Sequence, residues 1–426
     1  MFCRNIIIIL FLSIYCGFGQ DSTSANQSLS TCSSILFDSN QSMRSGVENI
    51  LTIHKGVTKI EDKLLGTSWF ESNSFAGKSG NVIGRFAKYF LVDIPINFVF
   101  IHFNHEYYGH GGRYREYDLG KIDYQFYSPP PYGPGGGYAK ISEWPENFNI
   151  QKKITIWQAG PETHDLLNKN LSLNWISRGE SYYNENILYL WTWQDRFQYI
   201  QHFDILPSNI NGALYDPEGY IWLLNHNAGV DNPENLIMSL DDLKKKDMLN
   251  LINPFVWYSL YAQLKTYIFD GNTTASLPTL KFSEFNYLPS LRTTLTPFGP
   301  EYHLENYIKY KNIVSLIDLS IGDQTFYHNW WGLGINLNNI YRNNQYSADV
   351  YFNAWNQPII ELDNEFSTLE KDEMGYAFSL RSLFDITNQQ FPISIIAELG
   401  YKTSGFIQGY TIDTSPIIMV GLGIHN

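Results

Sequence analysis

The stretch Tyr346-Ser-Ala-Asp-Val-Tyr-Phe-Asn-Ala-Trp355 alternates apolar and polar side chains along most of its length. Alternation with a period of two predicts a β-strand that has one apolar face. About eight such segments follow one another from Ser290 to the end of the chain, separated by clusters of Gly, Asn, Asp and Pro. The pattern predicts an antiparallel β-domain over residues 273–426. Its other clear strand segments are Asn312–Ile321, Asn329–Leu337, Gly375–Leu383, Ser394–Tyr401 and Ile417–Ile424.

These strand segments are about ten residues long, and they carry Tyr or Trp near their ends. In both respects the C-terminal part resembles the outer-membrane β-barrels, whose strands turn an apolar face to lipid and a polar face inward. The resemblance implies a barrel-like domain that contacts a membrane. A soluble antiparallel sandwich or barrel is the alternative.

The composition of the 426-residue chain limits its partners. It has 29 Lys and Arg against 42 Asp and Glu, a formal net charge of −13, and no basic stripe. Nucleic acid is therefore not an expected partner, because phosphate binding needs clustered positive charge. Charged residues make up 17% and aromatic residues 16% of the chain. Few charges and many aromatic rings favour a protein that touches a membrane interface.

The N-terminus has the pattern of a secretory signal. Arg4 precedes the apolar run Ile6–Ile14, and Gly17-Phe-Gly19 fits a small-x-small cleavage site, so we expect a signal peptide over residues 1–19. A retained membrane anchor is the alternative. Residues 20–45 are rich in Ser, Asn and Gln and predict a disordered leader. We therefore expect an exported protein of the outer membrane or periplasm of a Gram-negative-type envelope.

The region 46–272 predicts a mainly helical module, which gives an α+β chain. Phe86–His110 predicts a helix that either has a kink at Pro95 or starts near Asp93, and that is ended by the glycines that follow Tyr108. Pro161–Ser177, Tyr182–Phe203 and Asp241–Phe269 predict three more helices. The last of these is expected to be buried or interfacial, with a transmembrane helix as the alternative.

The first predicted helix ends in His102-Phe-Asn-His-Glu-Tyr-Tyr-Gly-His110, a dense group of imidazoles with one carboxylate. These are the usual ligands and bases of zinc and iron sites. His105 and His110 are five residues apart, so they lie about 140° apart around a regular helix. They converge if a π-bulge lies between them, or if the helix ends at Gly109 and His110 swings back.

The segment His105-Glu-Tyr-Tyr-Gly-His110 resembles the HExGH signature of the site-2-protease-type zinc metalloproteases, with one additional Tyr. Farther on, Ala159-Gly-Pro-Glu-Thr-His-Asp-Leu-Leu167 is similar to the GPxxN segment of that family, with His164 in place of Asn. The resemblance implies that His105 and His110 bind zinc and that Glu106 activates water. The nearest match to the family's LDG motif is Phe269-Asp-Gly271.

The residues themselves allow the same chemistry, because a catalytic zinc takes three protein ligands and keeps one position open. His164 or Glu162 is the expected third ligand, and Arg113 or Tyr108 is the expected oxyanion or substrate contact. The Gly-rich stretch near Gly135 is expected to offer an edge to a peptide. The leading hypothesis is a zinc-dependent peptidase.

The alternative is a non-enzymatic outer-membrane β-barrel with the helices as plug or cap. Its histidines would then hydrogen-bond tyrosines and carboxylates in a polar lumen.

Overall fold

The computed structural model describes residues 32–71, 74–146, 148–202, 215–328, 330–343, 345–360, 372–386 and 393–425. The expected signal peptide and the first part of the expected leader lie outside these residues. The described elements belong to one compact unit, Thr31–Asn426. Helices dominate up to residue 269 and strands dominate from residue 274, so the predicted α+β class is confirmed.

Ten antiparallel strands form one large sheet, in the order β1-β14-β13-β12-β11-β10-β9-β8-β7-β6. All six quoted strand segments fall on strands of this sheet. The sheet is open, because β1 and β6 are edge strands of the described part rather than partners of each other. The strands are β1 (Cys32–Phe37), β6 (Leu280–Phe282), β7 (Phe285–Thr296), β8 (Gly299–Tyr310), β9 (Ile313–Gly322), β10 (Trp331–Arg342), β11 (Tyr346–Pro358), β12 (Asp372–Asp385), β13 (Ile393–Lys402) and β14 (Ser415–His425).

Strand β1 lies inside the segment for which the composition predicts disorder. It pairs with β14, from Cys32 opposite His425 to Phe37 opposite Val420. Leu36 is buried, and it anchors this short strand in the core. The strand could not be recognised from its own residues because its partner comes at the other end of the chain.

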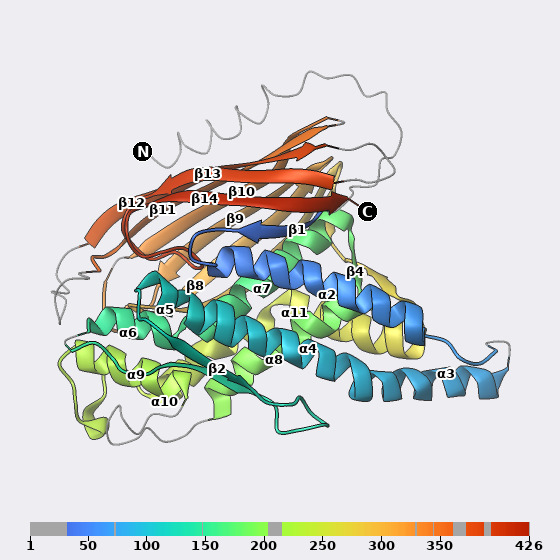
Figure 1. The fold of residues 1–426 in the computed structure, drawn as a ribbon, viewed down its shortest axis with the longest axis horizontal. Helices are drawn as coiled ribbons and strands as arrows, with labels where there is room; N and C mark the ends of the chain where they lie inside the picture. Colours follow the sequence, from blue (N-terminus) through green and yellow to red (C-terminus); the bar gives the residue numbers. More distant parts are fainter. Residues whose placement is uncertain are drawn as a thin grey trace. The chain divides into compact units, whose positions relative to one another are not determined.

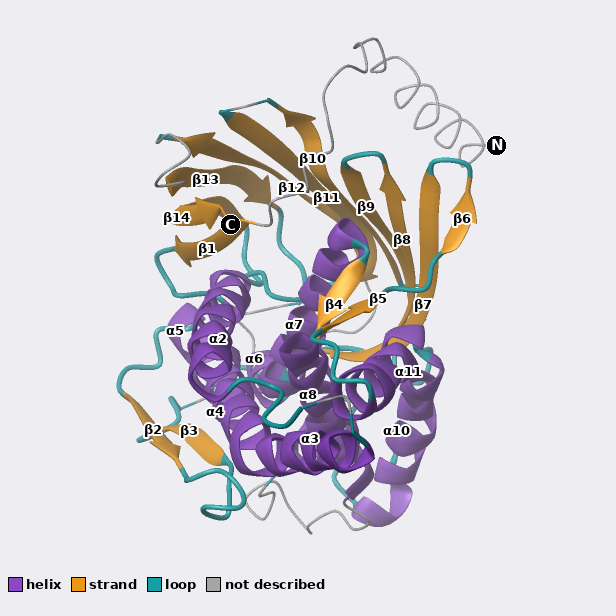
Figure 2. Cartoon of the chain, turned by 90° about the vertical axis from the view of Figure 1, so that its right-hand side faces the viewer, coloured by secondary structure: helices purple, strands orange, loops and turns teal. Residues whose placement is uncertain are grey.

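The helices gather on one face of the sheet (Figures 1 and 2). They are α2 (Met43–Leu65), α3 (Phe75–Lys88), η1 (Tyr89–Asp93), α4 (Ile94–Phe103), η2 (Asn104–His110), α5 (Gly111–Glu116), α6 (Ile150–Trp157), α7 (Ala159–Arg178), α8 (Tyr183–His202), α9 (Asp216–Asn227), α10 (Leu240–Asp247), η5 (Met248–Ile252), α11 (Pro254–Tyr261) and η6 (Ala262–Phe269). The short strands β2 (Ile122–Phe126) and β3 (Gly137–Ile141) form a separate pair, as do β4 (Glu180–Tyr182) and β5 (Thr274–Ser276).

The predicted helices are present with different bounds. The expected fourth helix is divided into α10, η5, α11 and η6, with Pro254 at the start of α11. The first one is longer than expected, since Phe75–Glu116 is helical throughout, with π-helical turns at η1 and η2. By length and composition this stretch is long and apolar enough to cross a membrane.

Helix α7 connects the sheet with the helices that lie farther from it. Its Leu171 and Trp175 share one buried cluster with Tyr307 of β8 and Leu316 of β9. Its other end packs against η2. This places the His/Glu segment on the side of α7 away from the sheet.

The strands turn their polar residues toward the helices and their apolar residues outward. On β13, Ser394, Glu398 and Lys402 are fully buried, whereas Ile395 and Leu399 are 47% and 62% exposed. Large apolar side chains are exposed on other strands as well: Leu319 and Ile321 on β9, Met374, Phe378 and Leu380 on β12, and Ile418, Val420 and Leu422 on β14. The buried face also holds apolar side chains, such as Leu316 on β9 and Met419 on β14. A soluble sheet that packs one face on a core shows the opposite arrangement.

Candidate metal centre

The π-helical turn η2 brings the two histidines of the sequence motif together. In a π-helix the hydrogen bonds join residues five apart, and the N–H of Gly111 donates to the carbonyl of Glu106 in this way. Residues five apart therefore face the same side, and His105 and His110 converge. The first of the two expected routes is confirmed. The second is wrong, because the helix continues beyond Gly109 into α5.

The glycines that follow Tyr108 do not end this helix. Gly109, like Gly160 at the start of α7, instead allows close packing between the two helices. A Cβ at Gly109 would lie 2.8 Å from the carbonyl oxygen of Ala159, and a Cβ at Gly160 would lie 2.2 Å from the His105 ring. Both positions therefore let η2 and the start of α7 approach more closely than larger residues allow. The close approach holds the His105 ring against α7.

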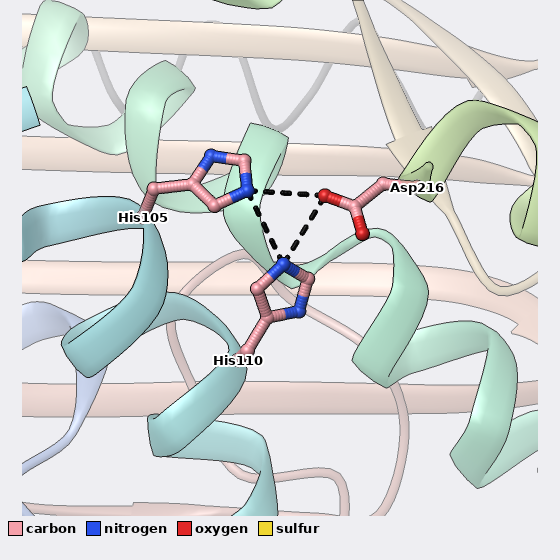
Figure 3. A group of neighbouring side chains, drawn as sticks. All are labelled: His105, His110 and Asp216. Carbon is pink, nitrogen blue, oxygen red and sulfur yellow. Dashed lines mark hydrogen bonds and ion pairs between the residues drawn. The ribbon is translucent and has the colours of Figure 1, made fainter. Parts of the chain in front are cut away.

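A third side chain completes the group: Asp216, at the start of α9 (Figure 3). Its Oδ2 lies 3.0 Å from His105 Nε2 and 3.1 Å from His110 Nε2. The two Nε2 atoms are 3.2 Å apart. All three residues are buried. Two imidazole nitrogens and one carboxylate oxygen thus converge on a single point.

This triangle fits a zinc ion. Zinc–nitrogen and zinc–oxygen bonds are about 2.0–2.1 Å long, so two ligand atoms of a tetrahedral site lie about 3.3 Å apart. The three observed separations are close to that value. A tetrahedral zinc bound here would take a fourth ligand besides these three atoms.

The tautomer of His110 supports the same assignment. Its Nδ1 lies 2.8 Å from the carbonyl oxygen of Ile156, which only accepts, so Nδ1 carries a hydrogen and donates it. In the neutral ring Nε2 then has a lone pair, and this lone pair faces the Asp216 carboxylate. Such a contact needs a proton or a metal ion between the two atoms. A carbonyl that orients the distal nitrogen is the usual support of a metal-binding histidine.

The electrostatics agree with a site built for positive charge. Burial by itself would lower the pKa of His110, but the charge and the hydrogen bond of Asp216 raise it to about 9. The pKa of His105 is also raised, against the effect of burial, mainly by its hydrogen bond with Asp216. Burial would raise the pKa of Asp216, but the two imidazoles lower it. The carboxylate therefore stays ionised and favours a cation beside it.

Glu106 is buried and lies close to the triangle, since its charge helps to raise the pKa of both histidines. Its side chain lies beside β3, where a Cβ at Gly137 would be 3.5 Å from its Cγ. Within the described residues, its carboxylate accepts no hydrogen bond. It is therefore available to accept a proton from a water molecule.

Three other predicted site residues lie away from the triangle. Arg113 donates two hydrogen bonds to Glu162, of 2.7 and 2.9 Å, and Glu162 also accepts one from the N–H of Gly409. Arg113 binds Glu116 as well. Tyr108 points toward α2, where a Cβ at Gly46 would overlap its ring. The structure therefore does not bring these side chains to the metal ligands.

His164 lies beside the triangle but outside it. Its ring centroid is 5.1 Å from that of His105, and its Nδ1 is 3.5 Å from Asp195 Oδ2. His105, His164 and Asp195 form a second group with metal-ligating side chains. Burial holds the pKa of His164 well below its usual value, so the ring is neutral.

Asp216 is not among the ligands predicted from the sequence. The residue lies in Tyr215-Asp-Pro-Glu-Gly219, a segment without a metal-site spacing of its own. Its only local signal is an acidic residue directly before Pro217 at a helix start. The folded chain, rather than any motif, brings it to the histidines.

Comparison of the chain with models of known protein families, with curated proteins and with solved structures found no match. The resemblance to the site-2-protease-type signature stays a prediction. The assignment of the triangle rests on its geometry and on the chemistry of its donors.

Proposed function

We propose that this chain is a zinc-dependent hydrolase, with His105, His110 and Asp216 as the metal ligands and Glu106 as the general base. The observation that carries the proposal is the convergence of His105 Nε2, His110 Nε2 and Asp216 Oδ2, which lie 3.0–3.2 Å from one another. Bound zinc would lower the pKa of a coordinated water to about 7 and polarise a carbonyl.

Glu106 accepts the proton of the attacking water and passes it to the leaving group. Its position directly after His105, beside a set of three candidate ligands, supports this role. Tyr199 helps to hold the third ligand, because its hydroxyl accepts a hydrogen bond of 3.3 Å from the N–H of Asp216.

A peptide is the substrate class that the surroundings of Glu106 favour. Strand β3 begins at Gly137, beside the Glu106 side chain, and among the described strands it pairs with β2 alone. An extended peptide that adds to its other edge would bring a backbone carbonyl toward Glu106. The protein is therefore a peptidase in this proposal.

We place this peptidase in the cell envelope, with the outer face of the sheet against the outer membrane. The inverted polarity of the strands supports the membrane location, as apolar-out and polar-in alternation is typical of membrane β-structure. In the alternative function the sheet is a non-enzymatic, barrel-like membrane protein and the helices are its plug or cap. The buried polar contacts between sheet and helices are compatible with either function.

The test is the metal content of the mature protein, purified in detergent without chelator and measured by mass spectrometry. We expect one zinc per chain in the wild type and none in the double variant His105→Ala/His110→Ala. Glu106→Gln should keep the metal and lose peptide hydrolysis. Wild-type protein without stoichiometric metal would overturn the hydrolase in favour of the non-enzymatic function.

A further inference from the structure

We infer that helices close the open sheet at both of its edges, so that the bilayer contacts a wall made of strands and helices together. The inference rests on the membrane location proposed above and is independent of the metal chemistry. It differs from a strand-closed barrel, in which every edge is paired with another strand.

At the first edge, Asn49 of α2 takes the place of a neighbouring strand. The N–H of Leu36 in β1 donates to Asn49 Oδ1 at 2.7 Å, and Asn49 Nδ2 donates to the carbonyl of Leu36 at 2.9 Å. Thr52 Oγ1 donates to the carbonyl of Ser34 at 2.6 Å. The side-chain amide thus satisfies both backbone groups of an edge residue, as a paired strand would.

At the other edge, a second asparagine makes the same pair of hydrogen bonds. The N–H of Thr293 in β7 donates to Asn250 Oδ1 at 3.0 Å, and Asn250 Nδ2 donates back to the carbonyl of Thr293 at 3.3 Å. Arg196 also donates to this carbonyl, at 2.6 Å. The short strand β6 covers the beginning of β7, and Pro289 has no N–H to satisfy.

A lipid environment makes these side-chain hydrogen bonds to the edge strands necessary. In water an edge strand can give its free N–H and C=O groups to solvent, whereas hydrocarbon offers no partner. Both asparagines are buried, so water does not compete for their amides. An asparagine amide therefore satisfies the backbone at each edge of the sheet, and the outer face of the same sheet is apolar. Both features suit a lipid environment.

The apolar surface continues from the sheet onto α11, which packs against β7. The exposed side chains of α11 and the start of η6 are Trp257, Leu260, Tyr261 and Leu264. Across the sheet, cross-strand rows such as Leu380, Leu399 and Ile418 are exposed as well. A charged or polar partner surface would leave both areas without complementary groups. The bilayer is the occupant that fits them together.

Lipid contact can be measured residue by residue in the full-length protein with its three native cysteines replaced by serine. Single cysteines at Leu399 and Trp257 carry a fluorophore, and the protein is reconstituted in vesicles of phosphatidylcholine and phosphatidylglycerol with brominated acyl chains. Position 245 on α10 is the control, because the Lys245 side chain is 78% exposed on a charged helix. We expect brominated lipid to quench the emission at positions 399 and 257 at least twofold and to leave position 245 unchanged.

Quenching at position 399 alone would overturn the inference and leave the membrane location standing. Quenching at neither position would overturn both. Energy transfer between labelled chains that grows with protein concentration, without quenching, would show a second copy as the occupant instead.

The edge contacts have a separate test. Asn49→Leu and Asn250→Leu should each reduce the fraction of chain that folds into vesicles at least fivefold. Asn353→Leu is the matched control, because Asn353 lies on the same sheet in β11, between β10 and β12 and away from both edges. Equal folding of all three variants would overturn the role of the two amides.

Discussion

His110 Nε2 and Asp216 Oδ2 lie 3.1 Å apart, although 106 positions of sequence separate the two residues. Neither atom can donate to the other when the imidazole is neutral and its hydrogen is on Nδ1. A proton or a metal ion must join them. In that neutral state both atoms are hydrogen-bond acceptors. The properties of the site therefore depend on whether a proton or a metal ion joins them.

Replacing Asp216 should remove the metal. Loss of an outer-shell partner typically costs 10–100-fold in metal affinity, so loss of a ligand should cost roughly 100-fold or more. We expect this reduction for Asp216→Asn in a competition assay with a zinc-sensitive dye. Asp195→Asn is the matched control, and its affinity should change less. Equal losses of zinc affinity in the two variants would indicate that the metal lies closer to His164 and Asp195.

Metal affinity should rise with pH. Folded, metal-free protein holds a proton on His110 up to a pKa of about 9, and that proton must leave before zinc binds. Apparent affinity should therefore increase between pH 7 and pH 9, with release of protons that isothermal titration in two buffers can count. Affinity that stays flat over this range would contradict the assignment of His110.

The same proton affects the stability of the metal-free protein. The pKa of His110 is raised on folding from its ordinary value near 6.5, so the stabilisation is complete below about pH 6.5 and is lost as the pH rises through about 9. The midpoint of urea unfolding should fall across this window. With zinc bound, this dependence should become weaker or reverse, because the ion replaces the proton.

Gly160→Ala should damage the site through packing. The new Cβ would lie 2.2 Å from the His105 ring, which must then move away from Asp216. Overpacking of this kind costs about 1–3 kcal/mol, and zinc affinity should fall as well. Gly56→Ala is the control, because α2 leaves that position open and Ala favours helix by about 1 kcal/mol. Unchanged metal affinity in Gly160→Ala would show that His105 tolerates the shift.

Glu162→Gln separates a structural role from a ligand role. It removes one of the two carboxylates that pair with buried Arg113, while Glu116 stays paired. The cost should therefore be smaller than the about 3–5 kcal/mol of a buried charge left without any partner. We expect lower stability in urea and an unchanged zinc content. If the variant keeps its stability and loses zinc, Glu162 is a ligand after all.

The sequence patterns predict those parts of the fold that depend on neighbouring residues. Alternation located the strands from β9 to β14, and the five-residue spacing of His105 and His110 predicted a π-helical turn as one of two ways to bring the rings together. Contacts between distant segments were not accessible in this way. Strand β1 is recognisable only beside β14, and Asp216 only beside the histidines. The contacts that close the sheet edges could not be predicted for the same reason. Nothing in the sequence distinguishes Asn49 and Asn250 from other polar residues of the helices.

The pairing of β1 with β14 also determines the order in which the molecule can assemble. Cys32 lies opposite His425, so this edge of the sheet can form only after β14 has been synthesised. Adjacent hairpins from β7 to β14 can form early, because their contacts are local. Strand β1 can bind Asn49 of the nearby helix α2 before that, but it lacks its strand partner until β14 has been made. A chaperone that protects this N-terminal segment would shorten the period in which the edge of β14 is open to a wrong partner.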